Sequence, residues 1–208
     1  MPLDFSVLRA AIEQKITGIE QEYQKTQGLI LTEDDLKCLF YRKLMQIPNL
    51  SKRSRTNDKK IYAKPIHTEV SWYDKDGRLA IKPDITILEP ENLSILYKYN
   101  RDGSKLKLPS KQFAFNGKAI IFELKFIRNK TGITRKTFNG SIMNDYTKIQ
   151  NLFERLDSQE MPDGIFCYFV IFNKTDIKCN EFEDFRERNR ESYRHKIIYA
   201  TGKVLLDR

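Results

Sequence analysis

The chain has 208 residues, enough for one domain with a sizeable core, and its 40% hydrophobic content is ordinary for a globular protein. Its 37 basic and 28 acidic residues give a formal charge of +9, which favours a polyanionic partner, nucleic acid before membrane. Three scattered cysteines without a CxxC pair argue against a zinc site and a disulfide framework, and they predict a reducing, cytoplasmic location. The sequence has no apolar run near the ~20 residues of a membrane span and no pattern of a secretion signal.

The first part of the chain predicts two helices and a basic loop. Apolar residues recur at steps of three and four between residues 4 and 25, which is typical of an amphipathic helix. Thr32 and the acidic residues after it predict the start of a second helix, in which Asp35 occupies the position of a capping-box partner. Pro48 ends this helix, and residues 51–64 predict a polar, strongly basic loop.

Strands dominate the middle of the chain. Ile66–Tyr73 and Leu79–Leu88 predict two strands joined by a turn, which together form a hairpin. Residues 89–117 predict an excursion from the core, with an extra strand within Leu93–Tyr99. The apolar run Lys118–Ile127 predicts the next core strand.

The last part of the chain predicts alternating helices and strands. A second basic loop at residues 128–136 precedes a segment of helical period, residues 141–156. Gly164–Phe172 is almost wholly apolar, as expected of a central strand that is covered on both faces. Residues 180–194 predict a highly charged helix, and residues 196–206 contain the final strand.

This element order predicts an α/β fold in which a mixed central β-sheet is flanked by helices. The chain has neither an internal repeat nor a domain linker, so we expect a single domain over residues 1–208. Within that domain, residues 1–30 would carry the N-terminal helix and residues 32–206 the core.

Charged residues interrupt two of the apolar strands. Asp84 follows Pro83 in one strand, and Glu123 and Lys125 lie in the next. Alternate strand residues share a face, which places Glu123 and Lys125 about 6–7 Å apart along it. Buried charges are costly unless they are paired or bind a metal. Two carboxylates and an ammonium are well suited to hold a divalent cation beside a water molecule.

The pattern Pro83-Asp84 followed by Glu123-x-Lys125 resembles the active site of the PD-(D/E)XK nucleases, the restriction-endonuclease-like superfamily. Each short motif is common by chance, but here both lie in strand-like runs, in the right order, after a helix with acidic residues. Apart from an extra N-terminal helix and the excursion, the element order resembles the αβββαβ core of that superfamily. The resemblance implies a Mg²⁺- or Mn²⁺-dependent nuclease that hydrolyses phosphodiester bonds in DNA, and it favours an endonuclease.

The resemblance also implies roles for individual residues. Asp84 and Glu123 would bind the metal, with the backbone carbonyl of Leu124 as a third contact. Lys125 would orient or help to deprotonate the attacking water. An additional helical acid would come from Glu33, for which Asp35 is the rival, although capping already explains Asp35.

Further candidates are less specific. Glu69 alternates into the first core strand and is another acid that could face the site, whereas Glu20 on the first helix is less favoured. Lys148, three residues after Asp145, would lie near the scissile phosphate or form a solvated ion pair. The structural alternative for Glu123 and Lys125 is a same-face salt bridge, which stabilises an exposed strand by at most ~1 kcal/mol.

The two basic loops would contact phosphates without reading bases. Their candidate residues are Lys52, Arg53, Arg55, Lys59, Lys60, Arg128, Lys130, Arg135 and Lys136. RNA is not excluded as the nucleic acid, and a homodimer or a targeting partner protein is compatible with the sequence. The alternatives to the nuclease are a non-catalytic module of the same fold that binds nucleic acid or protein, or a catalytic subunit that needs a partner in a defence or mobile-element system.

Overall fold

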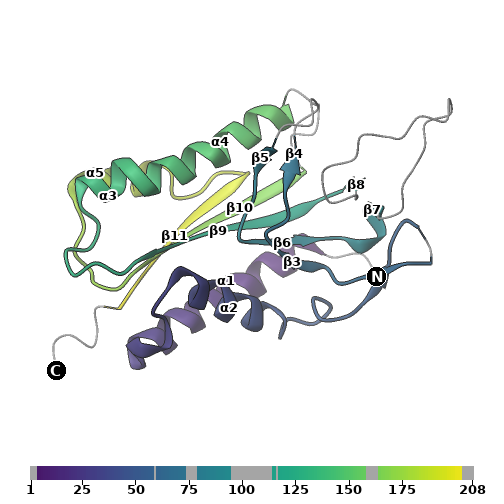
Figure 1. Cartoon of the computed structure of the whole chain (residues 1–208), viewed down its shortest axis with the longest axis horizontal. Helices are drawn as coiled ribbons and strands as arrows, with labels where there is room; N and C mark the ends of the chain where they lie inside the picture. Colours follow the sequence, from purple (N-terminus) through teal and green to yellow (C-terminus); the bar gives the residue numbers. More distant parts are fainter. Residues whose placement is uncertain are drawn as a thin grey trace.

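A five-stranded mixed sheet lies between two helical layers (Figure 1). Its strands, in spatial order, are β11 (His195–Thr201), β10 (Ile165–Asn173), β9 (Ala119–Ile127), β6 (Ile85–Leu88) and β3 (Ile66–Thr68). β9, β10 and β11 run parallel, while β6 runs antiparallel to both β9 and β3. The computed structural model describes residues 4–58, 60–73, 79–94, 114–115, 117–157 and 164–202.

Helices cover both faces of this sheet, as the sequence predicted. α1 (Phe5–Lys25) and α2 (Glu33–Leu44) pack on one face, and α4 (Met143–Asp157) and α5 (Asn180–Arg188) pack on the other (Figure 1). Shorter helical turns are η1 (Gln27–Leu29), η2 (Pro90–Asn92), α3 (Arg135–Thr137) and the π-helical turn η3 (Phe138–Ile142). Within the described part of the chain, no helix is both long and apolar enough to cross a membrane.

The two N-terminal helices form where the apolar spacing predicted them. In α1, the residues at steps of three and four, from Leu8 to Tyr23, are buried against the sheet and α2. Asp4 caps this helix by accepting hydrogen bonds from the amides of Ser6 and Val7. At the start of α2, the predicted capping box is confirmed, because the Thr32 and Asp35 side chains each accept from the other residue's backbone amide.

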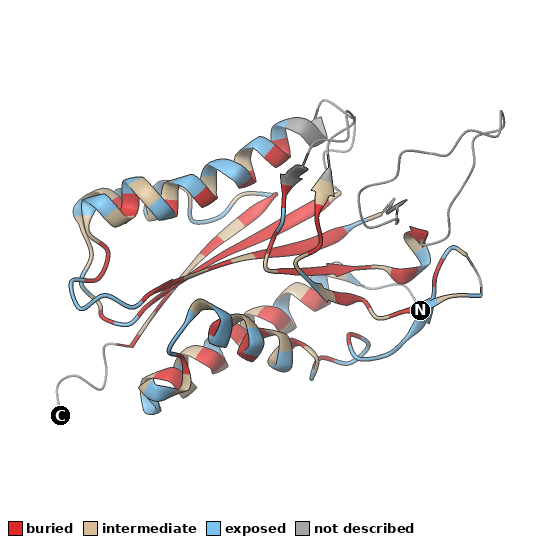
Figure 2. Ribbon diagram, viewed as in Figure 1, coloured by how far each residue is buried: buried red, intermediate tan, exposed pale blue. Residues whose placement is uncertain are grey.

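β10 is an interior strand of the sheet, between β11 and β9, and every one of its residues is buried (Figure 2). Its neighbour β9 is buried over most of its length, and only Glu123 and Lys125 in it are partly exposed. The prediction of a strand covered on both faces is therefore confirmed for β10. The only polar break in the otherwise apolar pattern of β9 marks the candidate site.

Two predicted strands are each broken in the middle. Ile66–Tyr73 divides into β3 and β4 (Trp72–Tyr73), because Glu69 adopts a positive φ of 52°, which ends the extended conformation. Leu79–Leu88 divides into β5 (Leu79–Ile81) and β6 around Pro83, which has no amide hydrogen for a strand ladder. The predicted hairpin is therefore present as two successive antiparallel pairs, β3 with β6 and β4 with β5, which belong to different sheets.

Other boundaries also differ from the predictions. Residues 51–64 are not a plain loop, because β1 (Ser54–Arg55) and β2 (Tyr62–Ala63) pair in them. In the excursion, β7 (Leu93–Ser94) pairs with β8 (Ala114–Phe115), while the rest of the predicted strand Leu93–Tyr99 lies outside the described residues. The second basic loop contains α3, and the charged helix ends at Arg188. β11 ends at Thr201, and residues 203–206 of the predicted strand lie outside the described residues.

Side chains and a turn of the chain cover the outer edge of β11. Glu20 on α1 accepts a hydrogen bond from the Thr201 amide, and Gln24 donates one to the Thr201 carbonyl. At the other end of the strand, the amide of Ser192 donates to the His195 carbonyl. Both ends of this edge are thus closed by contacts within the chain.

The aromatic contacts of β10 predict a large effect of one substitution. Phe172 is fully buried and packs edge-to-face against Tyr23 of α1 and Phe40 of α2. We expect Phe172→Ala to lower the free energy of unfolding by about 3–5 kcal/mol, measured by urea denaturation. Ile177→Ala, at an exposed side chain, should change it by no more than about 0.5 kcal/mol. Equal effects of the two substitutions would contradict this account of the core.

Candidate metal and catalytic site

The candidate site lies where β9 extends beyond β6. Pairing of these strands ends at Ile85 and Phe122, whereas β9 continues to Ile127. The backbone groups of alternate residues point to the same edge of a strand, so those of Leu124 and Phe126 face the side that β6 has left. These groups need partners other than a neighbouring strand.

Two carboxylates occupy this edge. The Leu124 amide donates to Oδ2 of Asp84 at 2.9 Å, and the Phe126 amide donates to Oε2 of Glu33 at 3.0 Å. Glu33 is the first residue of α2, and Asp84 immediately precedes β6, so two distant segments place their acids side by side. The Leu124 carbonyl lies on the same edge as its amide. Of the two helical acids considered, the structure therefore places Glu33 with Asp84.

Glu123 faces α4 and is the least satisfied group of the site. Its Oε2 is buried and accepts no hydrogen bond from any described residue. Burial raises the pKa of Glu123 to about 8, and the charges of Asp84 and Asp145 contribute to the rise. Burial also raises the pKa of Asp84, which the hydrogen bond from Leu124 partly opposes. Both acids are therefore held where a positive charge would stabilise their ionised forms.

Lys125 lies on the same face as Glu123 and is engaged by two acids. Its Nζ is 2.8 Å from Oδ2 of Asp145 and 3.5 Å from Oε2 of Glu33. Burial alone would lower the pKa of Lys125, but the hydrogen bond and charge of Asp145, together with Glu33, raise it above the ordinary value. The side chain is thus a charged ammonium at neutral pH.

Asp145 is a site residue that the sequence analysis did not select. It lies near the start of α4 with its side chain only 9% exposed, and its Oδ1 is 2.7 Å from Nζ of Lys148. The sequence feature that could have identified Asp145 is its helical spacing from Ile142 and Ile149, three and four residues away, which places this acid on a buried apolar stripe. Lys148 lies at the rim with its side chain 56% exposed, so the predicted ion pair is present and close to Glu123.

A second missed residue, Lys37 of α2, links the acids at the other side of the site. Its Nζ is 2.9 Å from Oε1 of Glu69, 3.0 Å from Oδ1 of Asp34 and 3.9 Å from Oδ1 of Asp84. Glu69 also pairs with Lys82, and its two lysine partners lower its pKa to about 2. Glu69 therefore stands beside the site as a partner of lysines. A groove of about 630 Å³ runs along Lys37 and Glu69.

The remaining predicted acids are elsewhere. Asp35 accepts hydrogen bonds from the amides of Leu31 and Thr32 in the cap of α2, which accounts for both its place and its lowered pKa. Glu20 binds Thr201 at the far edge of the sheet. Neither is brought to the site.

The two predicted basic segments lie in different places. Lys52, Arg53, Arg55 and Lys60 are exposed around the β1–β2 hairpin, and Lys59 lies outside the described residues. This hairpin adjoins the Leu88 end of β6, about 13 Å along the strand from Asp84. The segment that follows β9 is closer to the site. Its exposed cations are Arg128, Lys130, Arg135 and Lys136, of which Arg135 pairs with Glu181.

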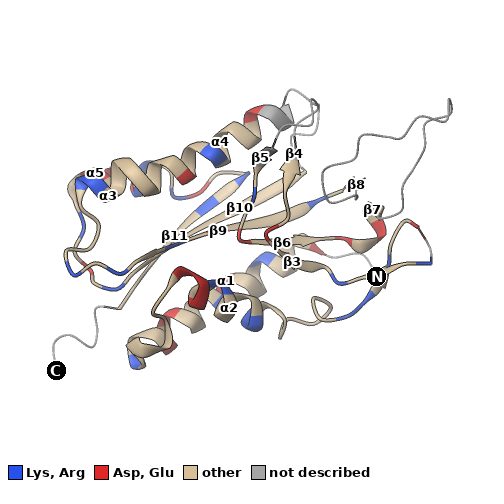
Figure 3. Cartoon of the chain, in the orientation of Figure 1, with Lys and Arg blue, Asp and Glu red and all other residues tan. Residues whose placement is uncertain are grey.

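These ion pairs bring charged side chains of both signs together around the end of β9. Figure 3 marks the charged residues along the ribbon. The described residues contain no group of three or more histidine, cysteine or acidic side chains arranged to hold a metal. The donors that fit a cation are Asp84, Glu123 and the Leu124 carbonyl, which leave further positions for water, as Mg²⁺ prefers. The unpartnered oxygen of Glu123 fits this assignment. Comparisons with protein families, with curated proteins and with solved structures each found no match for this chain.

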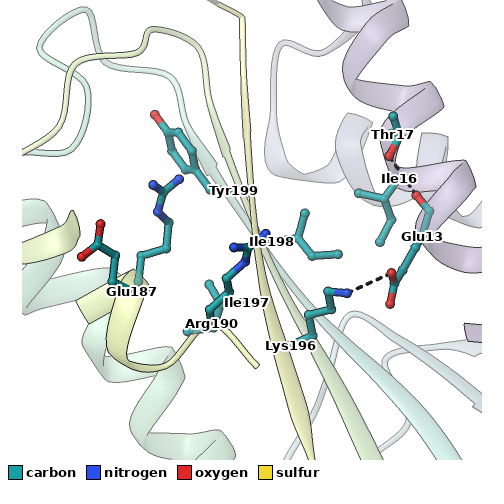
Figure 4. A pocket seen from close by; sticks show the side chains of 10 residues that line it. Glu13, Ile16, Thr17, Glu187, Arg190, Lys196, Ile197, Ile198 and Tyr199 are labelled. Carbon is teal, nitrogen blue, oxygen red and sulfur yellow. Dashed lines mark hydrogen bonds and ion pairs between the residues drawn. The ribbon is translucent and has the colours of Figure 1, made fainter. Parts of the chain in front are cut away.

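A separate cavity of about 440 Å³ lies between α1, α5 and β11 (Figure 4). None of the predicted site residues lines it. Its ion pair, Lys196 with Glu13 at 2.9 Å, joins β11 to α1 and resembles the Lys125–Asp145 pair in chemistry. It therefore provides a matched control, remote from the candidate site.

Hydrogen exchange tests the arrangement at the edge of β9. Asp84→Ala should speed exchange of the Leu124 amide, and Glu33→Ala that of the Phe126 amide, each without affecting the other. A hydrogen bond to a charged acceptor contributes about 1.5–3 kcal/mol, so the expected acceleration is at least about tenfold by NMR. Unchanged protection of both amides would show that these carboxylates do not cap β9.

Proposed function

We propose that the protein is a Mg²⁺-dependent nuclease that hydrolyses phosphodiester bonds in DNA, and that it acts as an endonuclease. One observation carries the proposal. Asp84, Glu123 and Lys125 converge where β9 extends beyond β6, and Glu33 joins them from α2. These are the positions that the resemblance to the PD-(D/E)XK superfamily implied, and the order of α2, β3, β6, β9, α4 and β10 agrees with its αβββαβ core.

A divalent cation would be held by the carboxylates of Asp84 and Glu123 and by the Leu124 carbonyl. When bound, it would supply an activated water and relieve charge on the phosphate in the transition state. Mn²⁺ prefers similar oxygen donors and would serve as a substitute. The raised pKa of Glu123 supports this assignment, because burial disfavours its ionised form by more than the charges of Lys148 and Lys125 offset, and its Oε2 has no hydrogen-bond partner among the described residues.

The protein's own side chains would orient the attacking water and bind the phosphates of the substrate. Lys125 keeps its proton, so it would orient the attacking water or a phosphate oxygen and balance the charge of the carboxylates. Lys148 stands at the rim, where it would bind a phosphate beside the scissile one. Arg128 and Lys130, just after β9, would extend the contact along the backbone of the nucleic acid.

Such phosphate contacts give affinity without sequence information. We therefore propose that target choice depends on the shape of the DNA, on a second copy of the chain or on a partner protein. The three cysteines are free, which agrees with the proposed location in a reducing cytoplasm.

Cleavage assays test the proposal directly. The purified protein should cut plasmid DNA in the presence of Mg²⁺ and stop when the metal is chelated. Lys125→Ala should lower the rate by at least about a hundredfold, because one misplaced or missing group at the reacting centre has effects of this size. Lys196→Ala removes a lysine of a similar strand ion pair and should leave the rate within about twofold, since it lies outside the site. If wild type and Lys125→Ala are equally inactive, the nuclease proposal fails.

Metal binding separates the nuclease from an inert module of the same fold. Isothermal titration with Mn²⁺ should give one site in the wild-type protein, and Asp84→Ala should abolish it by removing a ligand. Glu20→Ala changes a carboxylate that binds Thr201 at the far edge of the sheet and serves as the control. Absence of binding, or binding that is identical in Asp84→Ala, would favour the non-catalytic alternative.

A further inference from the structure

We propose that Asp145 is a positioning residue that holds Lys125 inside the site and Lys148 at its rim. The inference rests on the proposed nuclease function, to which it adds a fourth acid with a role of its own. Each oxygen of the carboxylate has one lysine partner: Oδ2 is 2.8 Å from Lys125 and Oδ1 is 2.7 Å from Lys148. One carboxylate thereby sets the separation of two cations.

Asp145 and Lys125 are largely buried and Lys148 is exposed, which suits Lys125 to the interior of the site and Lys148 to contact with the substrate at its rim. The side chain of Asp145 is 9% exposed, that of Lys125 is 17% exposed and that of Lys148 is 56% exposed. Removing a carboxylate and an ammonium from water costs several kcal/mol per ion, which only close pairing repays. Replacement by apolar residues would fill the same space more cheaply. The presence of paired charges at these positions is therefore consistent with a use in the site.

Asp145 is poorly placed to be a metal ligand. Both of its oxygens are engaged by ammonium groups, and it does not form a three-carboxylate cluster with Asp84 and Glu123 among the described residues. Instead, it competes with Glu33 for Lys125, whose Nζ is 2.8 Å from Asp145 and 3.5 Å from Glu33. Lys125 is thus drawn towards α4 and fixed between two acids from opposite faces of the sheet.

Asp145, the centre of this clamp on Lys125 and Lys148, is held in place by the packing of α4 and of the π-helical turn before it. Ile142 and Ile149, on either side of Asp145 along the buried stripe, are almost fully buried. Lys148 follows Asp145 by three residues, so both project from the same side of the helix. The position of Lys125 relative to the rim lysine therefore depends on how α4 packs against the sheet.

Asp145→Asn tests the clamp because it keeps the size of the side chain and removes its charge. We expect kcat for DNA cleavage to fall on the order of tenfold to a hundredfold through misplacement of Lys125. KM should change by a smaller factor than kcat, because it would be affected only through a weaker contact of Lys148 with a phosphate of the DNA. Asp145→Glu keeps a carboxylate and should recover part of kcat, whereas a purely structural role would give equal losses in both variants, in step with lost stability.

Lysine acylation followed by mass spectrometry gives a readout that is independent of cleavage. In Asp145→Asn, Lys125 and Lys148 should react several-fold faster, while Lys196 stays unchanged. The matched control Glu13→Gln should show the reverse, with Lys196 alone becoming more reactive, because Glu13 is its partner across the cavity in Figure 4.

The outcomes separate the inference from the proposed function. If wild-type protein cleaves nothing while Asp145→Asn selectively exposes Lys125, the nuclease proposal fails and the clamp stands as a structural arrangement. If wild-type protein cleaves DNA and Asp145→Asn changes neither kcat nor the acylation of Lys125, the clamp is overturned and the nuclease proposal survives.

Discussion

The structure depends on a mismatch in length between two neighbouring strands. β9 continues for five residues after its last partner in β6, and the amides of Leu124 and Phe126 face the vacated edge. An amide that is buried without an acceptor costs about as much free energy as a lost hydrogen bond. Asp84 and Glu33 supply the acceptors, so the same carboxylates that complete the sheet also form the candidate site. The hydrogen bonds that complete the edge of β9 therefore also position the acids of the candidate site.

The charges at this edge are balanced unequally. Lys37 forms ion pairs with Asp34, Glu69 and Asp84, and Asp145 forms ion pairs with Lys125 and Lys148. In contrast, the buried Oε2 of Glu123 has no hydrogen-bond partner among the described residues. Close networks of this kind repay the cost of desolvation only where each member is paired. The imbalance is concentrated on the group that we propose as a metal ligand, and a bound cation would relieve it.

The sequence predicted the parts of this arrangement that depend on local rules. Strand alternation placed Glu123 and Lys125 on one face, and the capping box placed the start of α2, and hence Glu33, correctly. The sequence did not predict which side chains of distant elements pair with one another. The buried stripe around Asp145 marks it as a buried acid, but the sequence around Asp145 or Lys37 does not indicate which other element carries the partner. The break at Glu69 depends on a backbone conformation that is uncommon outside glycine. The β1–β2 cations lie next to the motif in sequence but at the far end of β6 in space.

The closed outer edge of β11 limits how the protein can assemble. An open edge strand is a template on which another chain can add a strand, and natural proteins block such growth to avoid aggregation. Here a partner would have to displace Glu20 and Gln24 from Thr201, and the amide of Ser192 from His195. Strand addition at the β11 edge is thus opposed by hydrogen bonds that the chain already makes there, among them one from the Ile197 amide to the Arg190 carbonyl. At this edge, a second copy would therefore more readily contact helical or loop surfaces than extend the sheet by a strand.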